Sequence, residues 1–360
     1  MKMITVMLLG PSLDAVSGVS THLNQMYRSS LSRDFHLVHF QVGSEGRGES
    51  APGKLLRLVI SPFQFAVSLL RKRPDIVHVN TSMEQKSYWR DIVYVFIAKL
   101  MGKQVVYQVH GGALPENFFG NRPLLTGLLR KVLRSVDKVV LLAQTELRAY
   151  QHFDDALPLA VIPNAIDIAD DPQDKRMHVR PLLLVYVGRL AESKGLFELL
   201  SALAMVRSAG VTATLKIAGS GPAEVSLRAK VVELGLQDAV SFLGPVFGKE
   251  KDQLWKCADV FGFPTHHEGL PYALLESMAA RTPALVCPVG AIPDVMQDGV
   301  HGFFVALRDP QALAQAILRL DGDRALLQSM GQACRLRIES QYSLERLAQD
   351  FRDTYGALRR

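Results

Sequence analysis

The chain has 360 residues, which exceeds the needs of one ordinary core and suits two α/β domains. Hydrophobic residues at 48% and charged residues at 21% exclude a disordered or fibrous protein, and three cysteines without paired spacing fit neither a disulfide framework nor a zinc site. The net charge of +6 favours an anionic partner: a nucleotide diphosphate, an anionic lipid surface or nucleic acid.

The start of the chain and its apolar stretches predict a cytoplasmic protein. Residues 1–10 contain an apolar run that is too short and too weakly flanked for a signal peptide, and they predict a first buried strand. The sequence has no run of about 18 uninterrupted apolar residues, so we expect no membrane-spanning helix. The unpaired cysteines agree with a reducing compartment.

Short apolar runs alternate with longer helical patterns, which is typical of parallel sheets covered by helices on both faces. A polar, proline-bearing stretch without hydrophobic periodicity follows the first half and predicts an interdomain linker over 166–181. Residues 1–165 therefore predict a first doubly wound domain. Its strands are expected near 3–9, 35–41, 75–79, 104–109, 138–142 and 159–162.

Positive charge in this first half gathers in two stretches, 55–73 and 122–138. The second has leucines and valines at helical spacing and predicts an amphipathic basic helix. Two interpretations stay open: the helix packs on the sheet with a solvated cationic face, or it docks on a membrane surface. It has no aromatic residue on which a base could stack, so we set nucleic acid aside as a partner.

A second series of strands begins at Leu182 and predicts another doubly wound domain over 182–342. Beyond Gln311 the pattern is helical, and a last helix over 343–360 could cover either domain. Ligands of such domains bind beyond the carboxyl ends of the strands, so functional residues are expected in the loops that follow them. The strands are expected near 182–187, 213–218, 240–243, 259–263, 283–286 and 303–305.

Two features of the first domain meet this expectation. The loop after the first strand contains Gly18 and runs into a helix, which lets backbone N–H groups approach a phosphate or a sugar; a plain tight turn is the alternative. His110 ends the strand QVVYQVH and precedes two glycines, so it places an imidazole at a carboxyl end. The other nine histidines are interpreted as structural.

In the second domain, the loops after the first two strands suit a phosphate. The segment GRLAESKG follows strand 182–187 and brings Arg189 and Lys194 to a helix N-terminus, where a pyrophosphate could bind. Surface salt bridges are the alternative role for these cations. Gly219 lies in the next loop, AGSGP, which repeats the turn with small residues and also fits a plain turn.

The segment THHEGLPYALLESMAA carries two acids. Glu268 lies in the loop after strand 259–263, and Pro271 is suited to begin the helix that follows. Glu276 lies in the second turn of that helix, where a carboxylate suits the two vicinal hydroxyls of a ribose. The alternative is a capping or surface acid at Glu268 and an ordinary helical glutamate at Glu276.

With seven residues between Glu268 and Glu276 inside EGLPYALLESMAA, the sequence resembles the retaining glycosyltransferases of family 4. It is also similar to that family at VGRLAESKG, AGSGP, IPNAID and PVGAIPDVMQDGVHGFFV, and more loosely at SGVSTH and VHGG in the first domain. The resemblance covers nearly the whole chain. It implies a GT-B fold, in which two Rossmann-like domains face each other across an active-site cleft.

The same resemblance implies a role for each motif. The second domain binds a UDP- or GDP-sugar, and the first binds a glycan or polyprenyl-diphosphate-linked acceptor. Arg189 and Lys194 then neutralise the diphosphate, and Glu276 holds the ribose. Glu268 and His110 contact the transferred sugar. The remaining donor-binding positions are Gly18, Gly219, Gly269 and Leu270.

The resemblance further implies that no metal ion or other cofactor is needed, because cations and a helix N-terminus stabilise the leaving group. The scattered aspartates of the linker are expected to form no metal site, and the pair Asp154 and Asp155 is expected at the surface. Helix 343–360 would cross back to the first domain. Bacterial members commonly extend surface glycans, so we expect a cytoplasmic enzyme that binds peripherally to the inner membrane face. A nucleotide-sugar epimerase and an inactive binding subunit are the alternatives.

Overall fold

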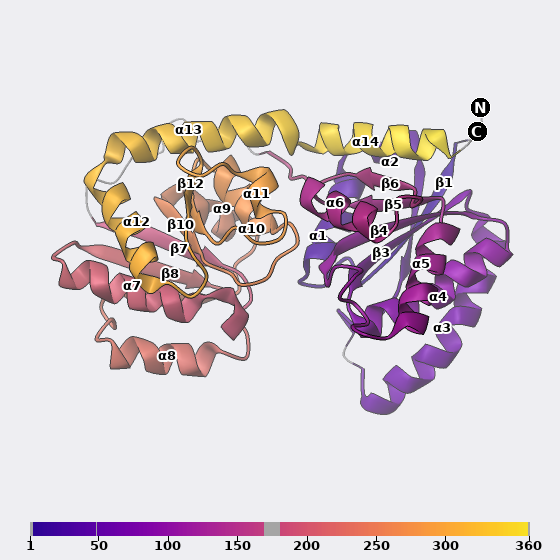
Figure 1. Ribbon diagram of the computed structural model, residues 1–360, viewed down its shortest axis with the longest axis horizontal. Helices are drawn as coiled ribbons and strands as arrows, with labels where there is room; N and C mark the ends of the chain where they lie inside the picture. Colours follow the sequence, from indigo (N-terminus) through magenta and orange to yellow (C-terminus); the bar gives the residue numbers. More distant parts are fainter. Residues whose placement is uncertain (1–2, 48, 169–180, 359–360) are drawn as a thin grey trace. The chain divides into compact units, whose positions relative to one another are not determined.

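The computed structural model describes residues 3–47, 49–168 and 181–358, and the chain divides into two compact units (Figure 1). Unit 1 comprises Met1–Asp167 and Tyr342–Arg360, and unit 2 comprises Ile168–Gln341. Most of the predicted linker over 166–181 lies outside the described residues.

The sheet of unit 1 has six strands in the order β2-β1-β3-β4-β5-β6, and every neighbouring pair is parallel. The predicted strands are all found, and two of them extend further than the sequence indicates, to Met83 and Gly112. The strands are β1 (Thr5–Gly10), β2 (His36–Gln41), β3 (Ile76–Met83), β4 (Gln104–Gly112), β5 (Lys138–Leu141) and β6 (Leu159–Val161).

Helices cover both faces of this sheet, which explains why β1 is buried at every position rather than at alternate ones. Met7 and Leu9 pack with α3, α4, α5 and α6, whereas Val6 and Leu8 pack with α1, α2 and α14. The helices are α1 (Gly18–Arg28), α2 (Leu31–Asp34), α3 (Ala51–Lys72), α4 (Gln85–Leu100), α5 (Pro123–Ser135), α6 (Gln144–Phe153) and α14 (Leu344–Ala357).

The last helix, α14, is part of the core of unit 1. Ser343 caps its N-terminus by accepting a hydrogen bond from the backbone N–H of Arg346. Phe351 and Tyr355 are fully buried against the sheet, and the Tyr355 hydroxyl lies 2.7 Å from Nδ1 of His78 on β3. A segment distant in sequence thus completes one helical layer of this unit.

The basic stretch 122–138 contains a shorter helix than predicted, because α5 ends at Ser135 and Lys138 already begins β5. Asp154, expected at the surface, is 6% exposed and accepts two hydrogen bonds from Arg134, at 2.6 and 2.7 Å. Arg130 lies 3.6 Å from the same carboxylate. The expectation for Asp154 was wrong because the cations of α5 bind it, and the helix packs on the sheet through Leu129 and Leu133.

Unit 2 contains a second six-stranded parallel sheet, in the order β12-β11-β10-β7-β8-β9. The doubly wound α/β prediction is therefore confirmed in both halves. The strands are β7 (Leu182–Val187), β8 (Ala213–Ala218), β9 (Val240–Gly244), β10 (Val260–Phe263), β11 (Ala284–Val286) and β12 (Gly302–Phe304). The helices are η1 (Glu192–Lys194), α7 (Leu196–Ser208), α8 (Glu224–Glu233), α9 (Gly248–Cys257), α10 (Tyr272–Ala279), α11 (Ile292–Val295), α12 (Pro310–Gly322) and α13 (Arg324–Gln341).

Candidate functional site

The topology of unit 2 points to one position along the edge of its sheet. The chain leaves β7 towards β8 on one side, whereas β10 adds to the other side of β7. Loops after two such strands diverge and leave room for a ligand at this switch point. The loop after β7 carries Arg189 and Lys194, and the loop after β10 carries Glu268. The residues that the sequence singled out therefore flank the position where the fold favours binding.

Lys194 and Glu268 form an ion pair across this switch point. The lysine Nζ donates to the carboxylate Oε1 of Glu268 and to the backbone oxygen of His267, which lies 3.3 Å away. The side chain of Lys194 is 21% exposed and that of Glu268 is 16% exposed, so a ligand can still reach both groups. The pair places a cation and an acid within one ligand's reach.

Glu276 lies on α10 and is held by two residues of α9. Lys251 Nζ donates to Oε1 at 2.7 Å, and Trp255 Nε1 donates to Oε2 at 3.3 Å. Both oxygens of the carboxylate are thereby oriented. Sequence reasoning missed Lys251 and Trp255, although their spacing of four residues puts them on one face of a helix.

Arg189 is the exposed cation of this region. Its backbone oxygen accepts a 2.8 Å hydrogen bond from the Tyr186 hydroxyl, which fixes the loop directly after β7. Within the described residues, its guanidinium forms no hydrogen bond or ion pair. It is therefore available to an anion, unlike the cations that surface acids already bind.

Glycines allow the loops of unit 2 to lie backbone against backbone. A Cβ on Gly219 would lie 1.8 Å from the backbone oxygen of Gly188, and its φ of +138° disfavours any other residue. A Cβ on Gly290 would lie 1.9 Å from the backbone oxygen of Glu268. Next to it, Gly269 accepts a 3.0 Å hydrogen bond from the N–H of Ala291. These contacts join the loops into one surface.

Leu270 follows Gly269 and is 5% exposed, so its side chain fills the core beneath the loop. Pro271 is the N-cap of α10, and the helix begins at Tyr272. A proline suits this place because the first N–H groups of a helix have no partner within it. The loop after β10 is therefore anchored at its end by an apolar side chain.

In unit 1 the corresponding switch point lies between β1 and β3. His110, near the end of β4, has its Nε2 2.9 Å from Oδ1 of Asn80 on β3. Its ring also meets the His22 ring edge-on, with centroids 4.7 Å apart. Gly18 is the first residue of α1, one turn before His22, and is exposed. Three neighbouring elements thus converge on His110.

Burial keeps the histidines of this cluster neutral. Loss of hydration lowers the pKa of His22 to about 4 and that of His78 to about 3, although the nearby polar side chain of Gln108 opposes the shift in both. Loss of hydration, followed by the positive charge that either neighbour would carry, places the pKa of His110 well below its ordinary value. His110 therefore presents a neutral imidazole, which can donate one hydrogen bond and accept another.

Within the described residues, no group of three or more His, Cys, Asp or Glu side chains lies close enough to hold a metal ion.

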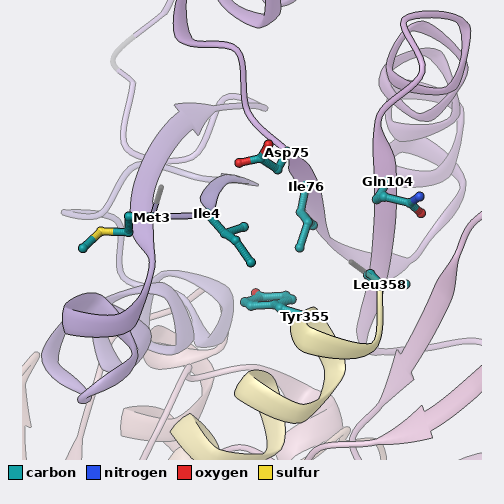
Figure 2. Close-up of a pocket in the computed structure, with 7 residues that line it drawn as sticks. All are labelled: Met3, Ile4, Asp75, Ile76, Gln104, Tyr355 and Leu358. Carbon is teal, nitrogen blue, oxygen red and sulfur yellow. The ribbon is translucent and has the colours of Figure 1, made fainter. Parts of the chain in front are cut away.

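Unit 1 also contains a small cavity of about 140 Å³, which is lined by residues that include Ile4, Asp75 and Tyr355 (Figure 2). It lies at the amino ends of β1, β3 and β4, the opposite edge of the sheet from His110.

Comparison with known protein families shows to which family the chain is related. Residues 16–170 match the model of glycosyltransferase family 4, and residues 181–323 match that of the glycosyl transferases group 1. The chain belongs to family 4, group 1, of the glycosyltransferases. The two matched segments include every motif from which the sequence predicted this family.

One relative of this family 4 chain is the GDP-mannose-dependent α-(1-6)-phosphatidylinositol monomannoside mannosyltransferase of Mycobacterium tuberculosis. It is 29% identical over 277 residues, which cover 71% of this chain and 70% of the relative. Two other curated relatives are matched over 44% and 49% of their own length, so the chain spans about half of them.

Solved structures share the fold of this family 4 chain. The sucrose-phosphate synthase of Thermosynechococcus elongatus superposes with a TM-score of 0.79 at 20% identity and covers 99% of both chains. Anabaena HepE in complex with UDP-glucose superposes with a TM-score of 0.75 at 18% identity, covering 98% of this chain and 100% of the other. The predicted GT-B class, with two Rossmann-like α/β domains, is confirmed.

Proposed function

We propose that the chain is a retaining, metal-independent hexosyltransferase that moves a sugar from a nucleotide-sugar donor to a hydroxyl of a glycan or lipid-linked acceptor. The observation that carries this proposal is the paired arrangement of the two acids after β10. Glu268 meets Lys194 at the switch point, and Glu276 meets Lys251 one helix further on. Each acid thus has a fixed position, and the two can bind different parts of one donor.

In this proposal unit 2 binds the donor. Arg189 and Lys194 neutralise the diphosphate, and two charge-assisted contacts are stronger than neutral ones. The carboxylate of Glu276, oriented by Lys251 and Trp255, accepts hydrogen bonds from the ribose hydroxyls. Glu268 accepts from hydroxyls of the transferred sugar. The tight loops at Gly219 and Gly269 bring backbone N–H groups towards the phosphates.

Unit 1 supplies the other side of the reaction. The Nε2–H of the neutral His110 donates to Oδ1 of Asn80, so the remaining ring nitrogen, Nδ1, accepts a hydrogen bond from a hydroxyl of the transferred sugar. Gly18 lets the start of α1 approach the phosphate. The acceptor oxygen forms a bond to the anomeric carbon on the face from which the diphosphate leaves, and the bond to the diphosphate oxygen breaks. The departing diphosphate takes the acceptor proton. We assign no side chain as a general base.

The donor is a UDP- or GDP-sugar in this proposal. A relative is named as GDP-mannose-dependent, and a structure with the same fold holds UDP-glucose. We further propose a cytoplasmic location and an acceptor linked to a lipid at the inner membrane face, in polysaccharide biosynthesis. The phosphatidylinositol acceptor in the name of the mycobacterial relative supports a lipid acceptor.

A thermal-shift screen against UDP, GDP, ADP and TDP sugars tests donor binding, because a ligand at 100 times its Kd stabilises the folded state by about 2.7 kcal/mol. The variant Arg189→Ala/Lys194→Ala should lose the shift. Its matched control is Arg228→Ala/Lys230→Ala, which removes two cations that pair with surface acids on α8. A full shift in the first variant would place the diphosphate elsewhere.

Transfer itself is tested by product release. A glycosyltransferase supplied with the right acceptor releases nucleoside diphosphate only when that acceptor is present. An epimerase would interconvert donor sugars without an acceptor. An inactive subunit would bind the donor, but it would neither release nucleoside diphosphate nor interconvert donor sugars. Either of those two results would overturn the assignment of transfer.

A further inference from the structure

Two neighbouring helices of unit 1, α3 and α4, carry half of the exposed large hydrophobic side chains of the described residues (Figure 1). Of 24 such side chains, 12 lie on these helices, which have 22 and 16 residues. Single exposed apolar residues are ordinary, but a contiguous patch of this kind marks an interaction surface. We name this surface the α3–α4 face.

The core already uses the opposite sides of both helices. In α3, Phe65 and Leu69 are buried, and Ser61 Oγ lies 2.8 Å from the hydroxyl of Tyr94 on α4. The rings of Phe65 and Tyr94 meet edge-on at 5.2 Å. The exposed side chains follow helical spacing on the outward sides, so each helix has one apolar stripe in the core and a second one outside. The outward stripes are Leu56, Val59, Phe63, Val67 and Leu70 on α3, and Trp89, Val93, Phe96 and Leu100 on α4.

Exposure on these stripes is large. Phe63 and Leu100 are each 71% exposed, and Phe96 is 63% exposed. Burying such side chains is favourable because it removes apolar surface from water. An apolar partner or lipid that covers the face thus has a strong driving force.

The charges that α3 itself carries are all positive. Helix α3 contains no aspartate or glutamate, and its one paired cation, Arg57, binds Glu49. Four exposed cations at its ends form no ion pair within the described residues: Lys54, Arg71, Lys72 and Arg73. Anionic groups would neutralise them, and their long stems can lie along an apolar layer while the charges stay in water.

We propose that the α3–α4 face binds the surface of an anionic membrane, with its apolar stripes in the acyl boundary and its cations among the headgroups. A basic helix with an apolar stripe is typical of interfacial membrane binding. Trp89 suits the same boundary, because its ring is apolar while its N–H is polar. A second copy of this chain fits less well, since a symmetric contact would bring the unpaired cations of both copies together.

The geometry indicates a helix that lies on the membrane. Within the described residues, Pro52–Lys72 is the one helix long and apolar enough to cross a membrane, with a mean hydropathy of 1.3 over its best window. Phe65 and Leu69 hold it in the core of unit 1, however, so crossing would require that core to open. The binding energy must therefore come from the outward stripe alone.

The face differs from the basic helix at 122–138 that the sequence suggested for membrane docking. Arg130 and Arg134 of α5 are occupied by Asp154, whereas the four cations at the ends of α3 named above form no ion pair within the described residues. Helix α5 exposes one large apolar side chain, Leu124, among the described residues. The stronger membrane surface thus lies on α3 and α4.

This proposal deepens the lipid-linked acceptor proposed above and rests on it for its biological role, but its test needs neither donor nor acceptor. The purified full chain is sedimented with vesicles of phosphatidylcholine alone or of phosphatidylcholine with phosphatidylglycerol. We expect binding to the anionic vesicles and a loss of affinity near 0.5 M salt, where the Debye length falls to about 4 Å. Nucleotide binding is measured separately without vesicles, so either proposal can fail alone.

Two variants separate the contribution of the apolar side chains to vesicle binding from the contribution of the cations. Leu56→Gln/Phe63→Gln should reduce vesicle affinity at least tenfold, and Lys54→Gln/Arg71→Gln/Lys72→Gln should reduce it about a hundredfold at low salt. The matched apolar control is Val225→Gln/Val232→Gln on α8, where both valines are also exposed. The charge control is Lys131→Glu on α5. Both controls should sediment like the wild type.

Melting curves test whether each variant is folded. If Leu56→Gln/Phe63→Gln does not fold, Phe96→Gln/Leu100→Gln on α4 takes its place. A wild type that never sediments would overturn the proposal, as would an apolar variant that sediments equally well. A wild-type dimer that the apolar variant dissociates, without vesicle binding, would identify the face as a contact between copies instead.

Discussion

Lys251 donates a 2.7 Å hydrogen bond to Glu276, so an acid on α10 is oriented by a cation on α9. These residues are 25 positions apart, and the pair forms because α9 and α10 precede and follow β10. Neither residue is fully buried, and the side chains keep 29% and 19% of their exposure. An exposed pair contributes little to stability, so we expect this one to matter mainly for the ligand.

Substituting the two acids should separate donor affinity from turnover. Glu276→Ala should raise the donor KM by about ten- to a hundredfold, since hydrogen bonds to a charged group contribute about 1.5 to 3 kcal/mol. Glu268→Gln should lower kcat more than it weakens binding of the bare nucleoside diphosphate, because this acid would contact the reacting sugar. Steady-state kinetics and nucleotide titration measure both effects. Glu224→Ala, which removes a surface acid of α8, is the control, and wild-type kinetics in both site variants would contradict the assignment.

Gly219→Ala should disturb unit 2 and abolish detectable donor binding. Its Cβ would lie 1.8 Å from the oxygen of Gly188 at a φ of +138°, so the loops after β7 and β8 must separate. Backbone strain of this kind costs about 1 to 3 kcal/mol. Gly322→Ala is the control, because its Cβ would meet open space at the end of α12. Urea unfolding and nucleotide titration distinguish the two variants. If Gly219→Ala matched Gly322→Ala in both stability and nucleotide affinity, the two loops could separate without loss of the donor site, and the prediction would be wrong.

Unit 1 should lose stability as the pH falls from about 6.5 towards 4. The folded pKa values of His22 and His78, about 4 and about 3, lie below the ordinary value of 6.5, so the unfolded chain binds protons first. The stability that neutral histidines contribute is complete above the unfolded pKa and is lost below it. Each histidine that titrates only in the unfolded chain lowers the unfolding free energy by about 1.4 kcal/mol per pH unit.

Urea midpoints of unit 1 at pH 7 and pH 5 measure this loss. His78→Gln should show a smaller difference between the two pH values than the wild type, even where the substitution itself destabilises the unit. His152→Gln should keep the full difference, because that side chain is 84% exposed. An unchanged pH difference in His78→Gln would mean that carboxylates cause the loss.

Transfer should continue in excess EDTA. In the proposed function, Arg189 and Lys194 carry the charge that offsets the diphosphate, and leaving-group stabilisation would then need no divalent ion. The measurement is nucleoside diphosphate release after dialysis against EDTA, with and without Mg²⁺ or Mn²⁺. Loss of activity that either ion restores would refute the cationic mechanism.

The elements and loop motifs could be predicted from the sequence because they depend on local patterns. A short run such as Val6–Leu9, apolar at every position and followed by glycine and proline, favours a strand buried on both faces, and the segment GRLAESKG marks a strand end by its own residues. The α/β class, the positions of the strands and the acids at 268 and 276 followed from such patterns. They require no knowledge of what lies opposite each residue.

Tertiary structure alone decided which residues meet. The partners of Glu276 on α9, the position of Asn80 beside His110, and the burial of Asp154 by α5 all join residues from different elements. The stretch 55–73 stood out in the sequence only for its positive charge, and only the packed structure shows that the core takes one side of α3 and leaves the other exposed. Periodicity along a chain reports that a face is apolar, whereas what covers that face depends on long-range packing.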